Sequence, residues 1–150
     1  WHSERVAAAV MFVGISGQAS LVTSGDIPWE QYLVHMGTWP WEDPEMFRQA
    51  SPVTHAQKSR TPTLILHGED DPRVPVGQSY MMYRYLKLAG QAPVRLVLYP
   101  GEGHGNARAA SRWDYSLRLM RWMEHYLNGP GGDPPPYEVD YRLPEAEAQS

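Results

Sequence analysis

Two loops of this 150-residue chain carry residues whose types and spacing could perform acid–base chemistry. The first loop, residues 67–75, contains an acid run that ends at Asp71, and the second, residues 100–105, places His104 between two glycines. A carboxylate that bonds to an imidazole fixes the histidine tautomer and stabilises the protonated ring, so the histidine can deprotonate a serine. The two loops therefore predict a hydrolytic charge pair, with the acid ahead of the histidine along the chain.

Each loop alone also has a plainer interpretation. The run Glu69-Asp70-Asp71 would be a solvated turn, and His104 would be an ordinary loop histidine. A calcium loop is a further alternative for the acid run, but the run lacks the alternating Asp-x-Asp-x-Asp-Gly ligands. His67 is interpreted as a structural hydrogen-bonding residue, because it ends an apolar run directly before Gly68. The presence of both loops in this order favours the charge pair, and we expect no metal and no cofactor.

Buried strands are predicted directly before each of these loops. Residues 63–67 and 94–99 are short apolar runs bounded by prolines and glycines, a pattern typical of strands buried on both faces. Residues 6–13 form a third run of this kind, ended by Gly14. These runs predict three strands of one sheet.

Helices are predicted between and after the strands. Amphipathic patterns indicate one at 76–89 and another at 107–127. The apolar stripe of the second is expected to face the sheet and comprises Trp113, Leu117, Met120, Met123 and Leu127. Residues 16–57 are expected to be loop-rich, with short helices only at 29–34 and 44–49.

Alternating strands and helices with short connections predict parallel pairing and a three-layer α/β fold. In such folds, functional side chains collect beyond the carboxyl ends of the strands, where both loops lie. An acid followed by a histidine is the chain order of the α/β-hydrolase fold, in which the nucleophilic serine comes first. We therefore expect residues 1–127 to form the C-terminal part of an α/β-hydrolase domain, with a mainly parallel sheet that is incomplete on its own.

The C-terminal segment, residues 128–150, differs in composition from the rest. It is rich in proline and glycine and holds five acids and one base, whereas residues 1–127 hold twelve of each, so this segment carries the whole net charge of −4. It is predicted to be an irregular arm docked on the surface, with a short edge strand as the alternative. The side chains expected to dock it are Tyr137, Val139, Tyr141 and Leu143.

Composition excludes several functional classes. The neutral body offers no basic stripe for a nucleic acid. The longest apolar run, residues 6–15, is too short to cross a bilayer as a helix. The absence of cysteine excludes disulfides and thiolate nucleophiles, and it leaves the compartment open between the cytoplasm and the periplasm or cell exterior.

The segments around both loops resemble the prolyl oligopeptidase family of serine peptidases. Residues 61–75 are similar to the acid loop of that family, and residues 99–105 are similar to its histidine loop. Residues 37–42, continuing to 51–52, resemble its acylaminoacyl-peptidase and dipeptidyl-peptidase branches. The likeness covers roughly residues 1–127.

This resemblance implies roles for individual residues. The catalytic acid falls on Asp71 rather than Asp70, and the catalytic base falls on His104. The residues implied to bind substrate follow the strand that borders the primary specificity pocket, and they are Gln18, Ser20 and Leu21.

The family's nucleophile lies in a Gly-x-Ser-x-Gly elbow, which this sequence lacks. The nearest segment, residues 14–18, lacks the last glycine and shows no helical pattern after it, so Ser16 is not interpreted as the nucleophile. The resemblance places the serine about a dozen residues before Trp1. We expect it on an N-terminal fragment of the same precursor, which would also carry a β-propeller and the earlier strands.

The expected function is therefore hydrolysis of short peptides by a serine, an aspartate and a histidine. This chain alone is expected to be inactive and to act while non-covalently assembled with the N-terminal fragment. Two alternatives remain open, an esterase or lipase-like hydrolase and a non-catalytic interaction module on the hydrolase scaffold. Whether the assembly is a homo-oligomer is also left open.

Overall fold

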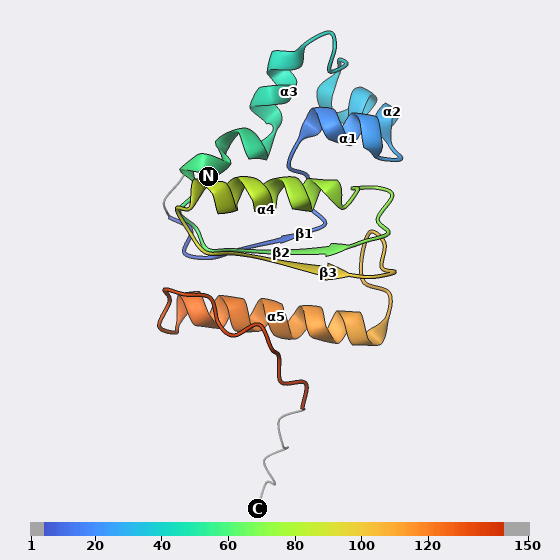
Figure 1. The fold of residues 1–150 in the computed structure, drawn as a ribbon. Helices are drawn as coiled ribbons and strands as arrows, with labels where there is room; N and C mark the ends of the chain where they lie inside the picture. The colour runs from blue at the N-terminus through green and yellow to red at the C-terminus, as the bar shows by residue number, and fades with distance from the viewer. Residues whose placement is uncertain (1–4, 143–150) are drawn as a thin grey trace, which may run out of the picture.

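The computed structural model describes residues 5–142 and contains a three-stranded parallel sheet covered on both faces (Figure 1). The strands are β1 (Ala9–Phe12), β2 (Thr63–Gly68) and β3 (Val94–Tyr99), in the spatial order β1-β2-β3. Helix α4 (Gly77–Ala89) covers one face and helix α5 (Ala109–Leu127) covers the other. The three layers and the parallel pairing confirm the predicted fold class.

The central strand β2 is buried along its whole length, as its unbroken apolar run predicted. Its pairing with β3 runs from Thr63 opposite Val94 to Gly68 opposite Tyr99. Strand β1 is shorter than the predicted 6–13. It begins where the Ala9 amide donates to the Pro62 carbonyl, and it ends because the next residue, Val13, turns to a φ of 45°.

Two cores lie on opposite faces of the sheet. Ile65 points toward α4 and packs with Met82 and Leu86, whereas its neighbours Leu64 and Leu66 point toward α5. The α5 core contains Trp122, whose indole also donates to the Pro62 carbonyl over 3.4 Å. Such two-sided burial holds the carboxyl ends of β2 and β3 in a fixed relation.

The predicted inward stripe of α5 is wrong at three of its five positions. Trp113, Met120 and Leu127 are exposed. The predicted Met123 does pack against the sheet, together with residues outside the predicted stripe, Trp122, Tyr115 and Tyr126. The reason is that α5 is apolar on two faces, so its periodicity does not identify the buried one.

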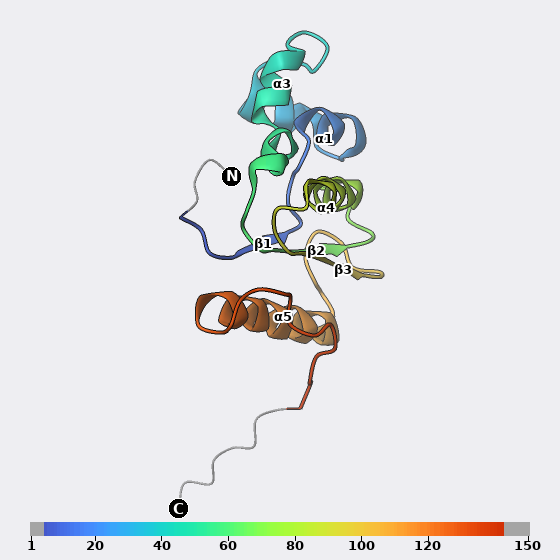
Figure 2. The same cartoon turned by 60° about the vertical axis from the view of Figure 1, so that its left-hand side comes forward.

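The segment between β1 and β2 is more helical than predicted (Figure 2). The structure confirms a helix near the predicted 44–49, α3 (Pro44–Ala50), which Asp43 caps by accepting from the Met46 amide at 3.0 Å. The short helix predicted at 29–34 corresponds to α2 (Pro28–Glu30) and a π-helical turn, η1 (Gln31–Met36). The helices that were not predicted are α1 (Gln18–Ser24) and the 3₁₀ helix η2 (Pro52–Lys58).

After α5, the chain from residue 128 to 142 forms no helix or strand, so the alternative of an edge strand is wrong for this part. This arm runs back along α5 (Figure 1). Arg118 donates to the Tyr137 carbonyl at 2.9 Å, and the Tyr141 hydroxyl donates to Asp114 at 2.6 Å. Leu143 lies outside the described residues, and the division into 1–127 and 128–150 stays a prediction.

Candidate active site

The loops that follow β2 and β3 lie against each other at the carboxyl ends of the strands. The Glu69 amide donates to the Tyr99 carbonyl at 3.0 Å, and the Asp70 amide donates to the Glu102 carbonyl at 2.9 Å. The approach is so close that a Cβ on Gly68 would lie 2.3 Å from the Glu102 carbonyl oxygen. Glycine at this position is therefore a steric requirement of the site.

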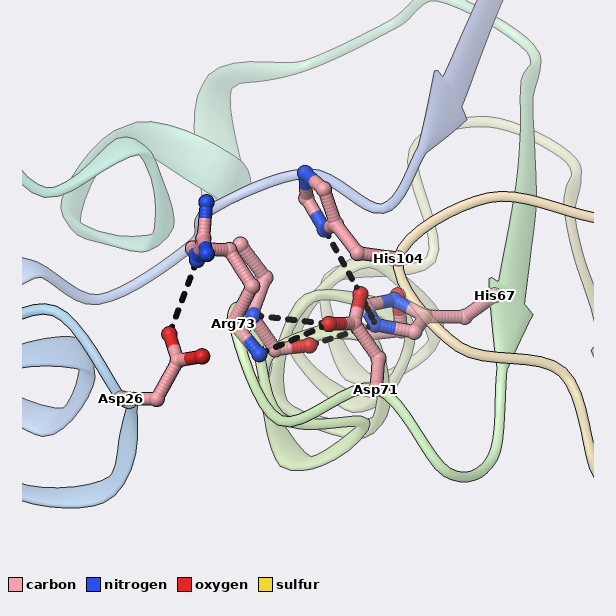
Figure 3. Close-up of polar contacts among 7 residues, drawn as sticks. Asp26, His67, Asp71, Arg73 and His104 are labelled. Atoms are coloured by element: carbon pink, nitrogen blue, oxygen red, sulfur yellow. Dashed lines mark hydrogen bonds and ion pairs between the residues drawn. The ribbon is translucent and has the colours of Figure 1, made fainter.

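This contact brings Asp71 and His104 together (Figure 3). The His104 Nδ1–H donates to Asp71 Oδ2 at 2.9 Å. The other carboxylate oxygen, Oδ1, accepts from the amides of Arg73 and Val74 at 2.9 and 3.0 Å. The Asp71 side chain is fully buried, whereas 43% of the His104 side chain is exposed. A buried carboxylate thus orients an accessible imidazole.

A second histidine, His67, also reaches the Asp71 carboxylate. Its Nε2–H donates to the Val74 carbonyl at 2.7 Å and lies 3.3 Å from Asp71 Oδ2. Because Nε2 carries the proton, Nδ1 accepts from the Ser79 hydroxyl, 2.6 Å away. Burial lowers the pKa of His67, so its ring is neutral. The structural role predicted for His67 is confirmed, but its contact with Asp71 was not predicted.

The histidine loop is anchored to the start of α5 by Glu102, which is 1% exposed. Its carboxylate accepts from the amides of Ala107 and Arg108 at 2.7 and 3.2 Å. Hydrogen bonds from the Ser111 side chain and from these amides lower the pKa of Glu102 below its ordinary value of 4.5. The ionised form therefore stabilises the loop that carries His104.

We expect Glu102→Gln to destabilise the protein at neutral pH and to have less effect in acid. A lowered pKa contributes stability above pH 4.5 that is lost as the pH falls through the folded-state value. The denaturant midpoints of wild type and variant should therefore differ at about pH 7 and converge as the pH is lowered below 4.5. A difference that stays constant across this range would contradict the assignment.

An open cleft of about 400 Å³ lies beside His104. Its aliphatic lining includes Val13 and Ile15, in the turn after β1, and Val74, in the acid loop. The remaining lining residues are Gly14, Ile27, Glu30, Gln31, His35 and Arg73. An ion pair joins the acid loop to the α1–α2 turn, because Arg73 lies 2.8 Å from the Asp26 carboxylate (Figure 3).

The three residues assigned by resemblance to the specificity pocket lie in α1 and are not among the residues lining this cleft. Leu21 is 1% exposed, and the Ser20 hydroxyl accepts from the Gln78 side chain at 2.9 Å. The Gln18 amide donates to the Ser51 hydroxyl at 2.9 Å. Their role in substrate binding stays a prediction.

Ser16 is fully buried, and its hydroxyl donates to the Gln78 carbonyl at 2.6 Å. The expectation that no helix follows it is wrong, since α1 begins at Gln18. Burial and this hydrogen bond are nonetheless unfavourable for a nucleophile, so the geometry of Ser16 argues against that role, as the missing last glycine of the elbow also does.

Two features are absent from the described part of the chain. Between residues 5 and 142, no three His, Asp or Glu side chains are grouped so that they could hold a metal ion. Within the same residues, no helix is both long and apolar enough to span a membrane.

Most of the chain matches one known protein family and its members. Residues 2–130 match the prolyl oligopeptidase family. The acylamino-acid-releasing enzyme of Arabidopsis thaliana is 32% identical over 130 residues, covering 82% of this chain and 17% of that protein. The human acylamino-acid-releasing enzyme is 34% identical over 134 residues, covering 84% of this chain and 18% of that protein.

Solved structures give the same result. The acylaminoacyl peptidase of Pyrococcus horikoshii superposes with a TM-score of 0.80 at 28% identity, over 86% of this chain and 22% of that one. The chain thus spans less than a quarter of these relatives, and its sheet is part of an α/β-hydrolase fold. The chain belongs to the prolyl oligopeptidase family and corresponds to the C-terminal catalytic part of its members.

Proposed function

We propose that this chain supplies the acid and the base of a serine peptidase, Asp71 and His104, and that the serine lies on an N-terminal polypeptide. The observation that carries the proposal is the 2.9 Å hydrogen bond from His104 Nδ1 to the buried Asp71 carboxylate. The bond leaves Nε2 on the side of the ring away from Asp71 (Figure 3). That nitrogen has no hydrogen-bond partner within residues 5–142 and can accept a proton.

In the proposed mechanism, His104 Nε2 takes the proton from the serine hydroxyl as its oxygen attacks the scissile carbonyl. Asp71 stabilises the imidazolium that forms and holds the ring in place. His104 then gives the proton to the leaving amine, and water hydrolyses the acyl-enzyme with the same histidine as base. The residues on this chain therefore act in both half-reactions.

The cleft beside His104 supports the substrate class that we propose. Val13, Ile15 and Val74 give it aliphatic walls that suit an apolar side chain next to the scissile bond. The relatives of the catalytic part include enzymes named for the release of acylamino acids. We propose short N-acylated peptides as the substrate class.

The N-terminal polypeptide is also the proposed structural partner. Strand β1 lies at the edge of the sheet among the described residues, so its outer amides and carbonyls have no strand beside them there. A parallel sheet normally has its edges and both faces covered. We refer to this chain together with the N-terminal polypeptide as the assembled enzyme, and we propose that the partner continues the sheet beyond β1.

A fluorophosphonate probe tests the proposal on the assembled enzyme. We expect it to label one serine, located by peptide mass spectrometry on the N-terminal polypeptide, because the probe reacts with serines activated by a histidine. N-acetyl-peptide anilides should be cleaved with a higher kcat/KM than matched acyl esters. The variant Ser16→Ala serves as control and should be labelled as the wild type is.

Other outcomes would favour the alternatives. Faster turnover of acyl esters would indicate an esterase. Absence of labelling on every serine would indicate a non-catalytic module, and labelling at Ser16 would overturn the assignment of the nucleophile to the N-terminal polypeptide.

A further inference from the structure

The side chain of Gln78, in the first turn of α4, is buried, and both the oxygen and the nitrogen of its amide make hydrogen bonds. Only 2% of the residue is exposed. Its Oε1 accepts from the backbone amides of Ser16 and Gly17 at 3.0 and 2.8 Å, and its Nε2 donates to the Ser20 hydroxyl at 2.9 Å. The backbone carbonyl of Gln78 also accepts from the Ser16 hydroxyl at 2.6 Å. One side chain thus satisfies two buried backbone donors of another segment.

The segment that Gln78 holds forms one wall of the cleft beside His104. This turn contains Val13 and Ile15, both of which line the cleft. Val13 has a φ of 45°, a conformation that a β-branched residue rarely adopts and that persists only where the surrounding structure imposes it. The Val13 amide is fixed on one side by the Leu66 carbonyl at 3.1 Å. Gln78 fixes the other end of the turn, at Ser16 and Gly17.

The same helical turn also holds the acid loop. The backbone amide of Gln78 donates to the carbonyl of Pro75, the last residue of the acid loop, at 2.9 Å. The neighbouring residue, Ser79, bonds to His67, which contacts Asp71. The start of α4 is therefore attached to the cleft wall through Gln78 and to the Asp71 carboxylate through Ser79.

We infer that Gln78 is a positioning residue, which sets the wall formed by Val13 and Ile15 at a fixed distance from the acid loop and so determines how tightly the substrate side chain is held. The inference rests on the proposed function, because it takes the cleft as the substrate site. Gln78 touches neither the Asp71 carboxylate nor the His104 ring. Its loss should therefore weaken binding of substrate and transition state alike, which raises KM and leaves kcat unchanged.

The test compares Gln78→Leu with Gln78→Glu in the assembled enzyme. Leucine removes the single oxygen, Oε1, that accepts from both the Ser16 and the Gly17 amide. We therefore expect KM for an N-acetyl-peptide anilide to rise on the order of tenfold, with kcat within about twofold. Glutamate keeps an oxygen in the Oε1 position and should restore KM. The exposed residue Gln91, changed to leucine, is the matched control and should behave as the wild type.

Hydrogen exchange provides a readout that does not depend on activity. In Gln78→Leu, amides in peptides covering residues 13–20 should exchange about tenfold faster or more, while β2 keeps its protection. Gln78→Asn, whose amide is withdrawn by one methylene, replaces the leucine variant if the latter does not fold. Wild-type exchange at 13–20, an equal defect in Gln78→Glu, or a fall in kcat without a rise in KM would overturn the inference. Failure of the wild type to turn over any substrate, with faster exchange still seen in the variant, would refute the proposed function alone.

Discussion

Replacing His104 by alanine should reduce kcat/KM of the assembled enzyme for an N-acetyl-peptide anilide by about 10⁶-fold. The loss is this large because the ring performs every proton transfer of the proposed mechanism, both to the leaving amine and from water. Folding should be unaffected. The ring is 43% exposed, and without it Asp71 keeps its bonds from the Arg73 and Val74 amides and its contact with His67.

Steady-state kinetics together with thermal unfolding would measure this effect. His125→Ala is the matched control and should leave turnover unchanged, because its ring contacts the Asp133 carbonyl of the arm and the Tyr126 ring near the end of α5. The fluorophosphonate probe should also react far more slowly with His104→Ala, since the serine would lack its base. Activity within about tenfold of the wild type would remove His104 from the proposed triad.

The sheet could be predicted from the sequence because its strands are apolar on both faces. The run at residues 63–67 differs by one residue from β2 as observed, and the run at 94–99 coincides with β3. Once the two strands are parallel neighbours, the loops that follow them must meet at the same edge. For this reason the sequence also predicted the proximity of Asp71 and His104.

Other parts of the fold depend on contacts that periodicity does not describe. Helix α5 presents Trp122 to the sheet and Trp113 to the outside, and both faces are apolar in sequence. Helix α1 has no side-chain cap and only seven residues, so it is stabilised by packing rather than by a local signal. Tertiary contacts decide both cases.

The contacts that support Asp71 and the cleft could not be predicted from the sequence either. His67 lies four residues before Asp71, but its contact with that carboxylate depends on how the loop between them folds back. Gln78 and Ser16 are 62 residues apart, and nothing in either local sequence links them. Residue types identified the acid and the base, whereas the groups that hold them became visible only in three dimensions.

Replacing Asp71 by asparagine should lower kcat by about 10⁴-fold, by forcing His104 into the wrong tautomer. The side chain cannot turn to avoid this. Its Oδ1 accepts from the Arg73 and Val74 amides, so the new amide nitrogen must take the place of Oδ2. There it faces two further donors, His104 Nδ1 at 2.9 Å and His67 Nε2 at 3.3 Å. His104 relieves the conflict by moving its proton to Nε2, which can then no longer accept one from serine.

The neighbouring acid provides the matched control, since Asp70 is exposed and its backbone amide donates to the Glu102 carbonyl of the histidine loop. Asp70→Asn should turn over substrate as the wild type does, and an equal loss in both variants would contradict the choice of Asp71. The double variant Asp71→Asn/His104→Ala gives a stricter test. Asp71 acts only through His104 in this mechanism, so the double variant should be no slower than His104→Ala alone. A further loss in the double variant would show that Asp71 has a role apart from the histidine it orients.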